Sequence, residues 1–253
     1  MKKALFIILV ITFSSLSFGQ EVKTFSFDLG YGVNGYNMNS INDFYIDSFA
    51  ATPENDYLRE YVRKGQYFRI GVNYTPISWL DVGFYGGYQF SSLTSAPWKD
   101  YYDSDLGETV YNKGNFELRT EATSVGINST LYLSELINSK DAVQNKFHYG
   151  IELNGGVSFS KVSVFHSTKT FMAFHRNDIY TSQDFHGQLG LKLEYDFTQQ
   201  PIFTTLGLRA GYQFLKSGVV RDAAGQDWLV NDKHLINLDF SGFYFGVYLK
   251  IGK

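Results

Sequence analysis

The chain has 253 residues, a formal net charge of −3, 18% aromatic residues, 24 glycines, four prolines and no cysteine. The lack of cysteine excludes a disulfide framework, a thiolate metal site and a lipidated N-terminal cysteine. A mildly acidic chain also lacks the basic face that nucleic-acid binding requires, so we expect no nucleic-acid partner. Many aromatic residues and glycines with few prolines favour a β-sheet protein with close backbone approaches.

The first nineteen residues have the pattern of a secretory signal peptide. Lys2 and Lys3 form the positive start, residues 4–13 form the apolar core, and Ser17 and Gly19 are the small residues before a cleavage site. We therefore expect a signal peptide at 1–19 and one mature domain at 20–253. No later stretch reaches the roughly 18 apolar residues that a membrane-spanning helix requires.

Eight segments alternate apolar residues with polar residues or glycine, and a period of two predicts β-strands. In chain order they are residues 24–33, 66–75, 79–90, 116–133, 146–160, 184–197, 202–215 and 234–251. The fourth begins with charge on both faces, so we expect this strand to continue beyond a bilayer into solvent. In the eighth, the apolar face changes after Phe240, which predicts a β-bulge near Ser241.

The sixth and seventh segments form the clearest pair, a hairpin around residues 198–201. One face of this hairpin is apolar and edged with aromatic residues, and the other carries charges, polar residues and glycine. An apolar band of about ten residues per strand is typical of a transmembrane β-hairpin, apolar toward lipid and polar toward a lumen.

The connections between segments alternate between long and short, at about 32, 3, 25, 12, 20, 4 and 18 residues. Outer-membrane barrels alternate in this way between long extracellular loops and short periplasmic turns. Lipid offers no partner to an open sheet edge, so the sheet must close. The sequence predicts an all-β fold, an eight-stranded antiparallel up-and-down transmembrane β-barrel. The alternative is a soluble lipocalin-like barrel with its apolar face inward.

Aromatic residues near the segment ends are expected to form two girdles at the membrane interfaces. Those beside the short turns are Trp79, Phe147, Phe197, Phe203 and Tyr248. Those beside the long loops are Tyr67, Phe90, Phe214 and Phe240.

The signal sequence, the eight alternating segments and the terminal GFYFGVYLKIGK resemble the small outer-membrane β-barrel proteins of Gram-negative bacteria, in particular the outer membrane protein beta-barrel domain type abundant in Bacteroidetes. The resemblance covers nearly all of the mature chain and rests on architecture. The alternation that the barrel assembly machinery reads in this family's last strand is matched by Phe243, Phe245, Val247, Leu249 and Ile251. The family's usual terminal aromatic residue has no match in Gly252 and Lys253.

The resemblance implies an outer-membrane location and no particular activity. It also implies contact with outer-membrane lipids and lipopolysaccharide, and insertion by the barrel assembly machinery. Another outer-membrane protein is a further expected partner, bound through the extracellular loops.

The polar face of the segments carries charges that would meet inside the barrel. They are Asp28, Arg69, Asp81, Glu152, Lys192, Glu194 and Arg209. An eight-stranded barrel is only wide enough for its side chains to fill it, and an unpaired buried charge is costly. We therefore predict a lumen charge network, which is either a structural plug or a gate that opens when ion pairs exchange.

Five histidines raise the alternative of an enzyme that hydrolyses or transfers acyl chains of lipopolysaccharide. We expect His148 and His186 to face the lumen, and His166, His175 and His234 to lie in or near outer loops. His166 precedes Ser167, and Asp178 follows His175 by three positions. No spacing indicates a nucleophile, a base and an orienting acid, so we predict no catalytic residue.

The long loops are rich in aromatic and acidic residues. Loops of this length usually carry function or are disordered, and exposed Tyr and Trp favour partner contact. A calcium site is partly matched by the carboxylates of Asp103, Asp105 and Glu108. The other ligands and the glycine of an EF-hand loop are missing. We therefore predict no metal and no cofactor.

Three functions remain as alternatives. The first is a non-enzymatic outer-membrane barrel with a structural or interaction role, whose outer loops, Asn34–Gly65 above all, bind a partner, a surface glycan or a larger membrane complex. The second is a narrow, porin-like gated channel. The third is a lipid A-modifying enzyme.

Overall fold

The structure is a computed structural model that describes residues 24–46, 61–94, 98–103, 109–137, 146–168, 174–197 and 205–252. The predicted signal peptide at 1–19, Phe203, Asp105 and Glu108 lie outside these residues. No helix within the described ranges is long and apolar enough to cross a membrane.

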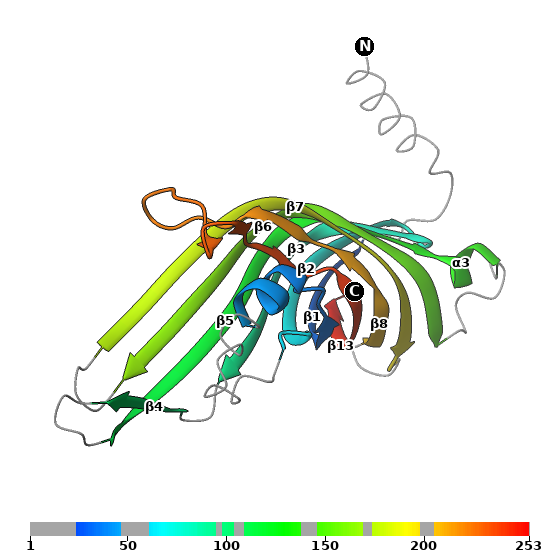
Figure 1. Cartoon of the computed structure of the whole chain (residues 1–253). Coiled ribbons are helices and arrows are strands. Elements are labelled where there is room, and N and C mark those ends of the chain that lie inside the picture. Colours follow the sequence, from blue (N-terminus) through cyan, green and yellow to red (C-terminus); the bar gives the residue numbers. More distant parts are fainter. Residues whose placement is uncertain are drawn as a thin grey trace, which may run out of the picture.

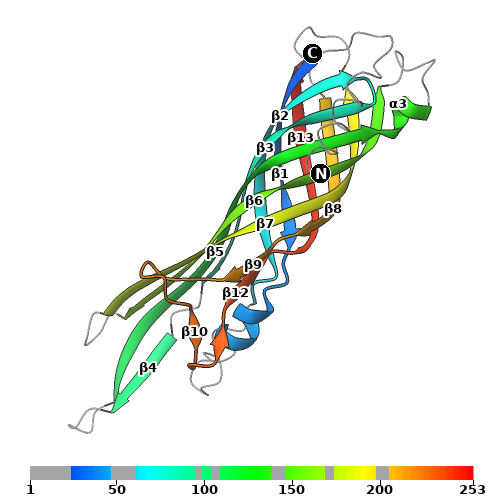
Figure 2. The ribbon, with the colours of Figure 1, turned by 90° about the horizontal axis from the view of Figure 1, so that it is seen from above.

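Eight antiparallel strands close into a barrel (Figures 1 and 2). They are β1 (Thr24–Gly35), β2 (Lys64–Ile77), β3 (Leu80–Thr94), β5 (Thr109–Tyr132), β6 (Phe147–Thr168), β7 (Phe174–Asp196), β8 (Thr205–Phe214) and β13 (Gly242–Gly252). Each strand pairs with the next barrel strand along the chain, and the pairing of β1 with β13 completes the ring. The predicted eight-stranded antiparallel up-and-down fold is confirmed.

The two faces of the barrel wall differ sharply in polarity. Large apolar side chains such as Phe84, Leu191 and Phe243 are exposed on the outside. Polar and charged side chains such as Asp28, Asn73 and Arg209 are buried inside. This is the arrangement of a transmembrane β-barrel. The soluble alternative, with its apolar face inward, is wrong.

Three neighbouring strands run well past the rest of the barrel. β5, β6 and β7 have 24, 22 and 23 residues, whereas β8 and β13 have 10 and 11. Figure 2 shows their far ends beyond the barrel at the end opposite α3 (Leu133–Ile137), together with β4 (Trp98–Asp103). The fourth predicted strand therefore does continue past the barrel, and it is longer than predicted.

The polarity of the wall reverses where these strands leave the barrel. On β5, the inward-facing Asn128 and Ser124 within the barrel give way to the inward-facing Leu118 and Phe116, which are fully buried. The outward face changes from Val125 and Ile127 to charged residues such as Glu121 and Arg119. Apolar-inside and charged-outside is the pattern of a strand in water, so Thr123 marks the outer edge of the apolar belt.

The reversed inner face supports a second hydrophobic core above the barrel. Against it pack the π-helix η1 (Ser40–Ile46) and the short strands β9 (Lys216–Val219), β10 (Leu229–Val230), β11 (His234–Leu235) and β12 (Asn237–Asp239). We call residues 36–46 and 215–241, with the inner face of β5–β7 that they cover, the outer cap. Its core residues include Met38, Ile41, Phe116, Leu118, Val162, Leu215, Trp228, Ile236, Leu238 and Phe240. The ring of Trp228 stacks on Tyr180 at 4.4 Å.

The predicted change of face near Ser241 does not come from a bulge within one continuous strand, although a register irregularity lies nearby, between Asn237 and Asp239. β12 ends at Asp239 and pairs with β9 in the cap, whereas β13 begins at Gly242 in the barrel. Leu238 and Phe240 face the cap core, and Phe243 faces outward from the barrel wall. The apolar residues change parity because the chain passes from the cap core, where they face inward, to the barrel wall, where they face outward.

Candidate functional site

All seven predicted lumen charges lie buried inside the barrel, together with the half-buried Lys250. With Lys250 they comprise four carboxylates and four cations, so the formal charges of this set cancel. They come from seven different strands, which the closure of the sheet brings together. The set divides into a middle layer and a lower layer, the latter nearer Thr24 and Gly252.

Glu152 is the centre of the middle layer. Its Oε1 lies 3.2 Å from Nη2 of Arg69, 3.2 Å from Nζ of Lys192 and 3.9 Å from Nη1 of Arg209. Arg209 also places Nη2 3.3 Å from Oδ1 of Asp28. The middle layer thus pairs three cations with two carboxylates where water has little access, and its formal charge of +1 is offset by the lower layer, where Lys250 faces Asp81 and Glu194.

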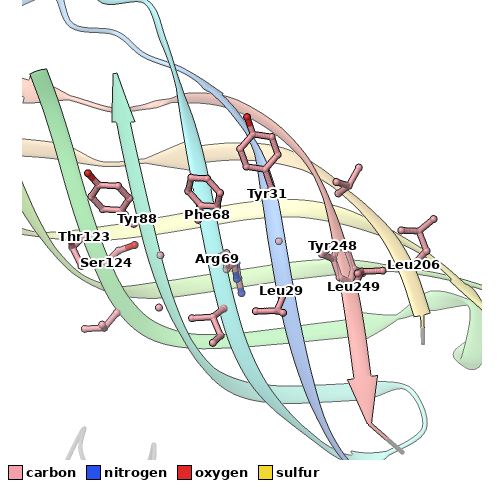
Figure 3. Close-up of a pocket in the computed structure, with 16 residues that line it drawn as sticks. Leu29, Tyr31, Phe68, Arg69, Tyr88, Thr123, Ser124, Leu206, Tyr248 and Leu249 are labelled. Atoms are coloured by element: carbon pink, nitrogen blue, oxygen red, sulfur yellow. The ribbon is translucent and has the colours of Figure 1, made fainter. Parts of the chain in front are cut away.

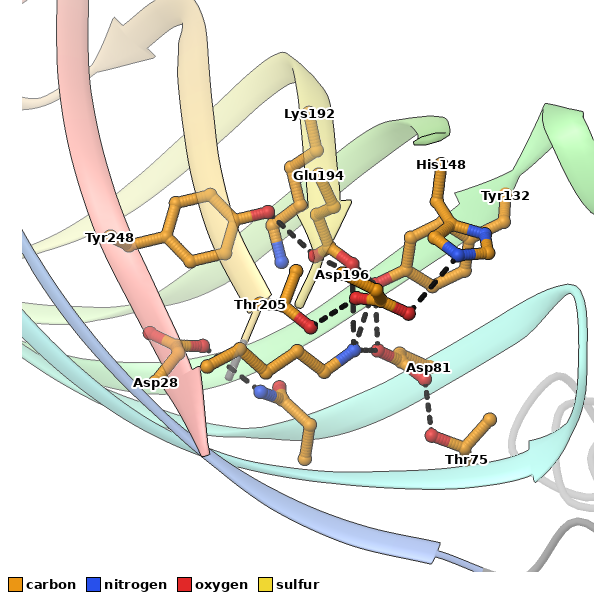
Figure 4. A network of polar contacts seen from close by, with 12 residues as sticks. Asp28, Thr75, Asp81, Tyr132, His148, Lys192, Glu194, Asp196, Thr205 and Tyr248 are labelled. Atoms are coloured by element: carbon orange, nitrogen blue, oxygen red, sulfur yellow. Dashed lines mark hydrogen bonds and ion pairs between the residues drawn. The ribbon is translucent and has the colours of Figure 1, made fainter. Parts of the chain in front are cut away.

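The lower layer connects opposite walls of the barrel at the end near α3 (Figure 4). Lys250 donates to Asp81 at 2.7 Å and to the hydroxyl of Tyr132 at 3.0 Å. Tyr132 lies 2.9 Å from both Asp81 and Glu194, and Tyr248 donates to Glu194 at 2.6 Å. The two carboxylates are therefore held by one ammonium group and two phenols.

A polar vestibule of about 260 Å³ opens below this layer. At its wall, His148 lies 2.7 Å from Glu135 of α3 and 3.2 Å from Asp196 of β7. These contacts tie α3 to the end of the barrel. The expectation that His148 faces inward is met, and its neighbours are structural partners.

Amides fill the upper layer, at the mouth toward the outer cap. Gln213 donates to Gln89 at 3.1 Å and accepts from Gln188 at 2.7 Å, and Asn34 donates to Gln89 at 2.6 Å. The cavity between these side chains holds about 20 Å³, the space of a single water. The side chains therefore fill the lumen at this level.

Three residues predicted for the aromatic girdles lie elsewhere. Tyr67 and Tyr248 face the lumen, and Phe240 lies in the cap core. The two tyrosines belong to the inward face, where glycines make room for their rings: a Cβ at Gly207 would overlap Tyr248, and one at Gly246 would overlap Tyr67. Arg209 packs over the ring of Tyr248 at 4.3 Å.

The remaining girdle residues that the structure describes lie on the outer surface. Phe147, Phe197 and Phe214 are exposed, and Trp79 and Phe90 are partly exposed. The rings of Phe147 and Tyr195 pack at 4.8 Å. This outer aromatic contact is typical of the interfacial zone of a membrane barrel.

The histidines do not assemble an enzyme-like site in the described residues. His186 contacts Tyr85 in the lumen, and His234 stacks on Phe44 in the outer cap at 4.2 Å. The register places Ser167 opposite His175 at the far end of the β6–β7 extension. That pair lies six residues, or up to about 20 Å, beyond the level of Lys161. Among the described residues, no cluster of three acids or histidines is placed to hold a metal ion.

Sequence reasoning missed the outer cap as a folded unit. The signal was present in residues 116–122, where apolar residues move from the outward face to the inward face. The apolar residues of 215–240 were interpreted partly as strand and partly as loop, because their partners lie far away in sequence.

Comparison with known proteins shows neither a family nor a function for this chain. No protein-family model matches the sequence, and no curated protein matches it. Ail, the attachment invasion locus protein of Yersinia pestis, is 10% identical over 91% of this chain and 99% of its own, with a TM-score of 0.39. Neisserial surface protein A is 12% identical over 90% and 96%, with a TM-score of 0.38. The outer membrane protease OmpT of Escherichia coli is 8% identical over 95% and 100%, with a TM-score of 0.37. At these values none of their activities transfers to this chain.

Proposed function

We propose that this protein is a closed, non-enzymatic barrel of the outer membrane that holds a folded cap above the bilayer for contact with a partner. The observation that carries the proposal is the hydrophobic core of the outer cap, which sits on a lumen filled by side chains. A filled barrel is a rigid support, and the long strands β5–β7 raise the cap well beyond the apolar belt.

Exposed apolar residues on the cap support a contact function. Leu229 and Leu235 pair across the β10–β11 ladder and are 47% and 45% exposed, and Phe44 is 37% exposed. Apolar residues gathered on a water-facing surface are a feature of interaction sites. The proposed partner is a protein, a surface glycan or a larger membrane complex.

The experiment is a mild detergent extraction of tagged protein from native outer membranes after surface crosslinking. The L229S/L235S double variant tests the patch, and Lys233→Ser, at an exposed position on the same hairpin, is the matched control. We expect a stoichiometric partner with the wild type and the control, and its loss with the double variant. A partner bound equally by all three proteins, or no partner at all, would contradict the proposal.

The gated channel is the second candidate, and one observation favours it. Glu152 lies near three cations, so ion pairs can exchange without leaving the carboxylate alone. The amide layer above opposes it, because an ion path would require Gln89 and Gln213 to separate. Bilayer conductance of the wild type, and an increase with Arg209→Ala, would favour the channel over a closed barrel.

The lipid-modifying enzyme has the least support. Ser167 and His175 stand far from the level at which acyl chains end, and the register places Asp178 opposite Val164 rather than beside them. Lipid A of altered mass in cells that overexpress the protein, restored by His175→Ala, would reverse this conclusion.

A further inference from the structure

A hollow of about 690 Å³ lies on the outer surface of the barrel (Figure 3). It crosses six neighbouring strands, β8, β13, β1, β2, β3 and β5, and its wall includes Leu29, Ile70 and Val125. These three residues and Gly86 form one row across the sheet, because Leu29 pairs with Ile70, Ile70 with Gly86 and Gly86 with Val125. Gly86 has no side chain, so the row has a gap at its position.

Aromatic rings border the hollow on the side toward the outer cap. Figure 3 shows Tyr31, Phe68 and Tyr88 side by side on β1, β2 and β3. The rings of Tyr31 and Phe68 lie 5.0 Å apart. The hollow is thus a smooth apolar surface whose upper border ends in the Tyr88 hydroxyl.

That hydroxyl joins the hollow to a charged cluster just above the apolar belt. Arg119 donates to the Tyr88 oxygen at 2.9 Å, and Tyr88 donates to Glu121 at 2.7 Å. Glu121 also pairs with Arg119 at 2.6 Å and with Lys161 at 3.3 Å. Two cations therefore share this carboxylate, and their side chains are 46% and 43% exposed.

The charged side chains at this rim comprise three cations, Arg119, Lys161 and Lys64, and two carboxylates, Glu117 and Glu121, so this set carries a formal charge of +1. Glu117 lies two residues further from the barrel and accepts a hydrogen bond from Ser92 at 3.3 Å. Lys64, on the outward face at the upper end of β2, is also exposed. A guanidinium and an ammonium group bind phosphate through short charge-assisted hydrogen bonds.

We propose that the hollow and the Arg119–Lys161 pair form one binding site for a lipid with a phosphate headgroup. The acyl chain lies across Gly86, and the phosphate binds Arg119 and Lys161. Gly86 and Phe90, which shares a row with Glu121, are four residues apart on β3, or about 13 Å. The first part of an acyl chain spans that distance. The inference rests on the proposed membrane location but not on the proposed partner of the cap.

Native mass spectrometry of the purified full-length protein in detergent tests the site. Dipalmitoyl phosphatidylglycerol is the probe, and dipalmitoylglycerol, which lacks the phosphate, is the uncharged comparison. The variants are R119Q/K161Q, which removes the cations, and Gly86→Leu, which fills the gap. Arg221→Gln is the control, since Arg221 is an exposed arginine paired with Asp227 on the outer cap. Heat-modifiable migration on a gel verifies that each variant is folded.

We expect one tightly retained phosphatidylglycerol on the wild type and the control, and retention weakened by about tenfold or more in both site variants. Equal retention by every variant, or equal retention of dipalmitoylglycerol, would overturn the proposal. Competition by inorganic phosphate together with no effect of Gly86→Leu would reduce the site to a simple anion site. A dimer lost in Gly86→Leu would make a second copy the occupant and would also contradict the proposal.

Discussion

Gln213 on β8 donates a hydrogen bond to Gln89 on β3, with 3.1 Å between Nε2 and Oε1. These strands are four steps apart in either direction around the eight-stranded ring, so this bond crosses the full width of the lumen. Lys250 on β13 and Tyr132 on β5 are also four steps apart and form the corresponding contact at 3.0 Å at the other end. The lumen is therefore crossed near both of its ends.

The buried position of Glu152 makes its charge important for stability. We expect Glu152→Gln to cost about 3–5 kcal/mol, because it leaves three buried cations with too little negative charge. Glu121→Gln is the matched control and should cost less than about 1 kcal/mol, since its partners are exposed to solvent. Urea unfolding in lipid vesicles, followed by tryptophan fluorescence, measures both. Similar costs for the two variants would mean that Glu152 is hydrated.

Leu208 tests which face of β8 meets lipid. It is 40% exposed on the outer surface, and Leu208→Arg should cost roughly 2–4 kcal/mol, the cost of an arginine near the bilayer midplane. Leu208→Phe keeps the site apolar and should cost little. The free energy of unfolding in vesicles decides the matter. If arginine were tolerated as well as phenylalanine, Leu208 would not face hydrocarbon.

Alanine substitutions at Gly207 and Gly86 test which side of the barrel wall has room for an added side chain. A Cβ at Gly207 would approach the ring of Tyr248 to less than 3.0 Å, whereas the nearest atom to a Cβ at Gly86 is Cγ2 of Ile70 at 3.7 Å. Gly207→Ala should therefore cost roughly 1–3 kcal/mol from overpacking. Gly86→Ala should change stability by no more than about 0.5 kcal/mol. The thermal stability of folded protein on gels compares them, and the reverse order would show that Tyr248 does not occupy the space over Gly207.

Ionisation of Tyr36 is expected to reduce the stability of the outer cap at alkaline pH. Its ring packs edge-on to Phe240 at 5.1 Å, and its hydroxyl has no hydrogen-bond partner in the described part of the chain. Burial raises the pKa of Tyr36 above its ordinary value, so the folded cap favours the neutral phenol. The stability that the neutral phenol contributes to the folded cap is fully present below about pH 10, the ordinary pKa of tyrosine. It is lost as the pH rises further, because the unfolded chain ionises first.

Tyr36→Phe should be neutral or stabilising at pH 7, because it removes a buried hydroxyl without a partner, and it should delay alkaline loosening of the cap. Protease cleavage of the cap between pH 8 and pH 11 measures this, and Tyr61→Phe, at an exposed position, is the control. Identical pH profiles for Tyr36→Phe and the wild type would show that Tyr36 ionises without opening the cap.

The sequence by itself determined the barrel. A period of two with glycine and charge on one face leaves one way to satisfy both lipid and backbone, which is a closed sheet of eight strands. It also determined that Arg69, Glu152 and Arg209 share the lumen, since residues of the same parity in a narrow barrel must meet.

Only the tertiary structure decided which partners these residues have and where the barrel ends. Tyr67 and Tyr248 have the residue type and the position near a strand end that are expected of a girdle. Glycines on neighbouring strands nevertheless give their rings space inside the lumen. Phe240 faces a core whose other side is supplied by residues 36–46 and the extended strands. The alternation along one strand predicts which residues share a face of the sheet. Whether that face meets lipid, the lumen or the cap core depends on contacts with distant parts of the chain.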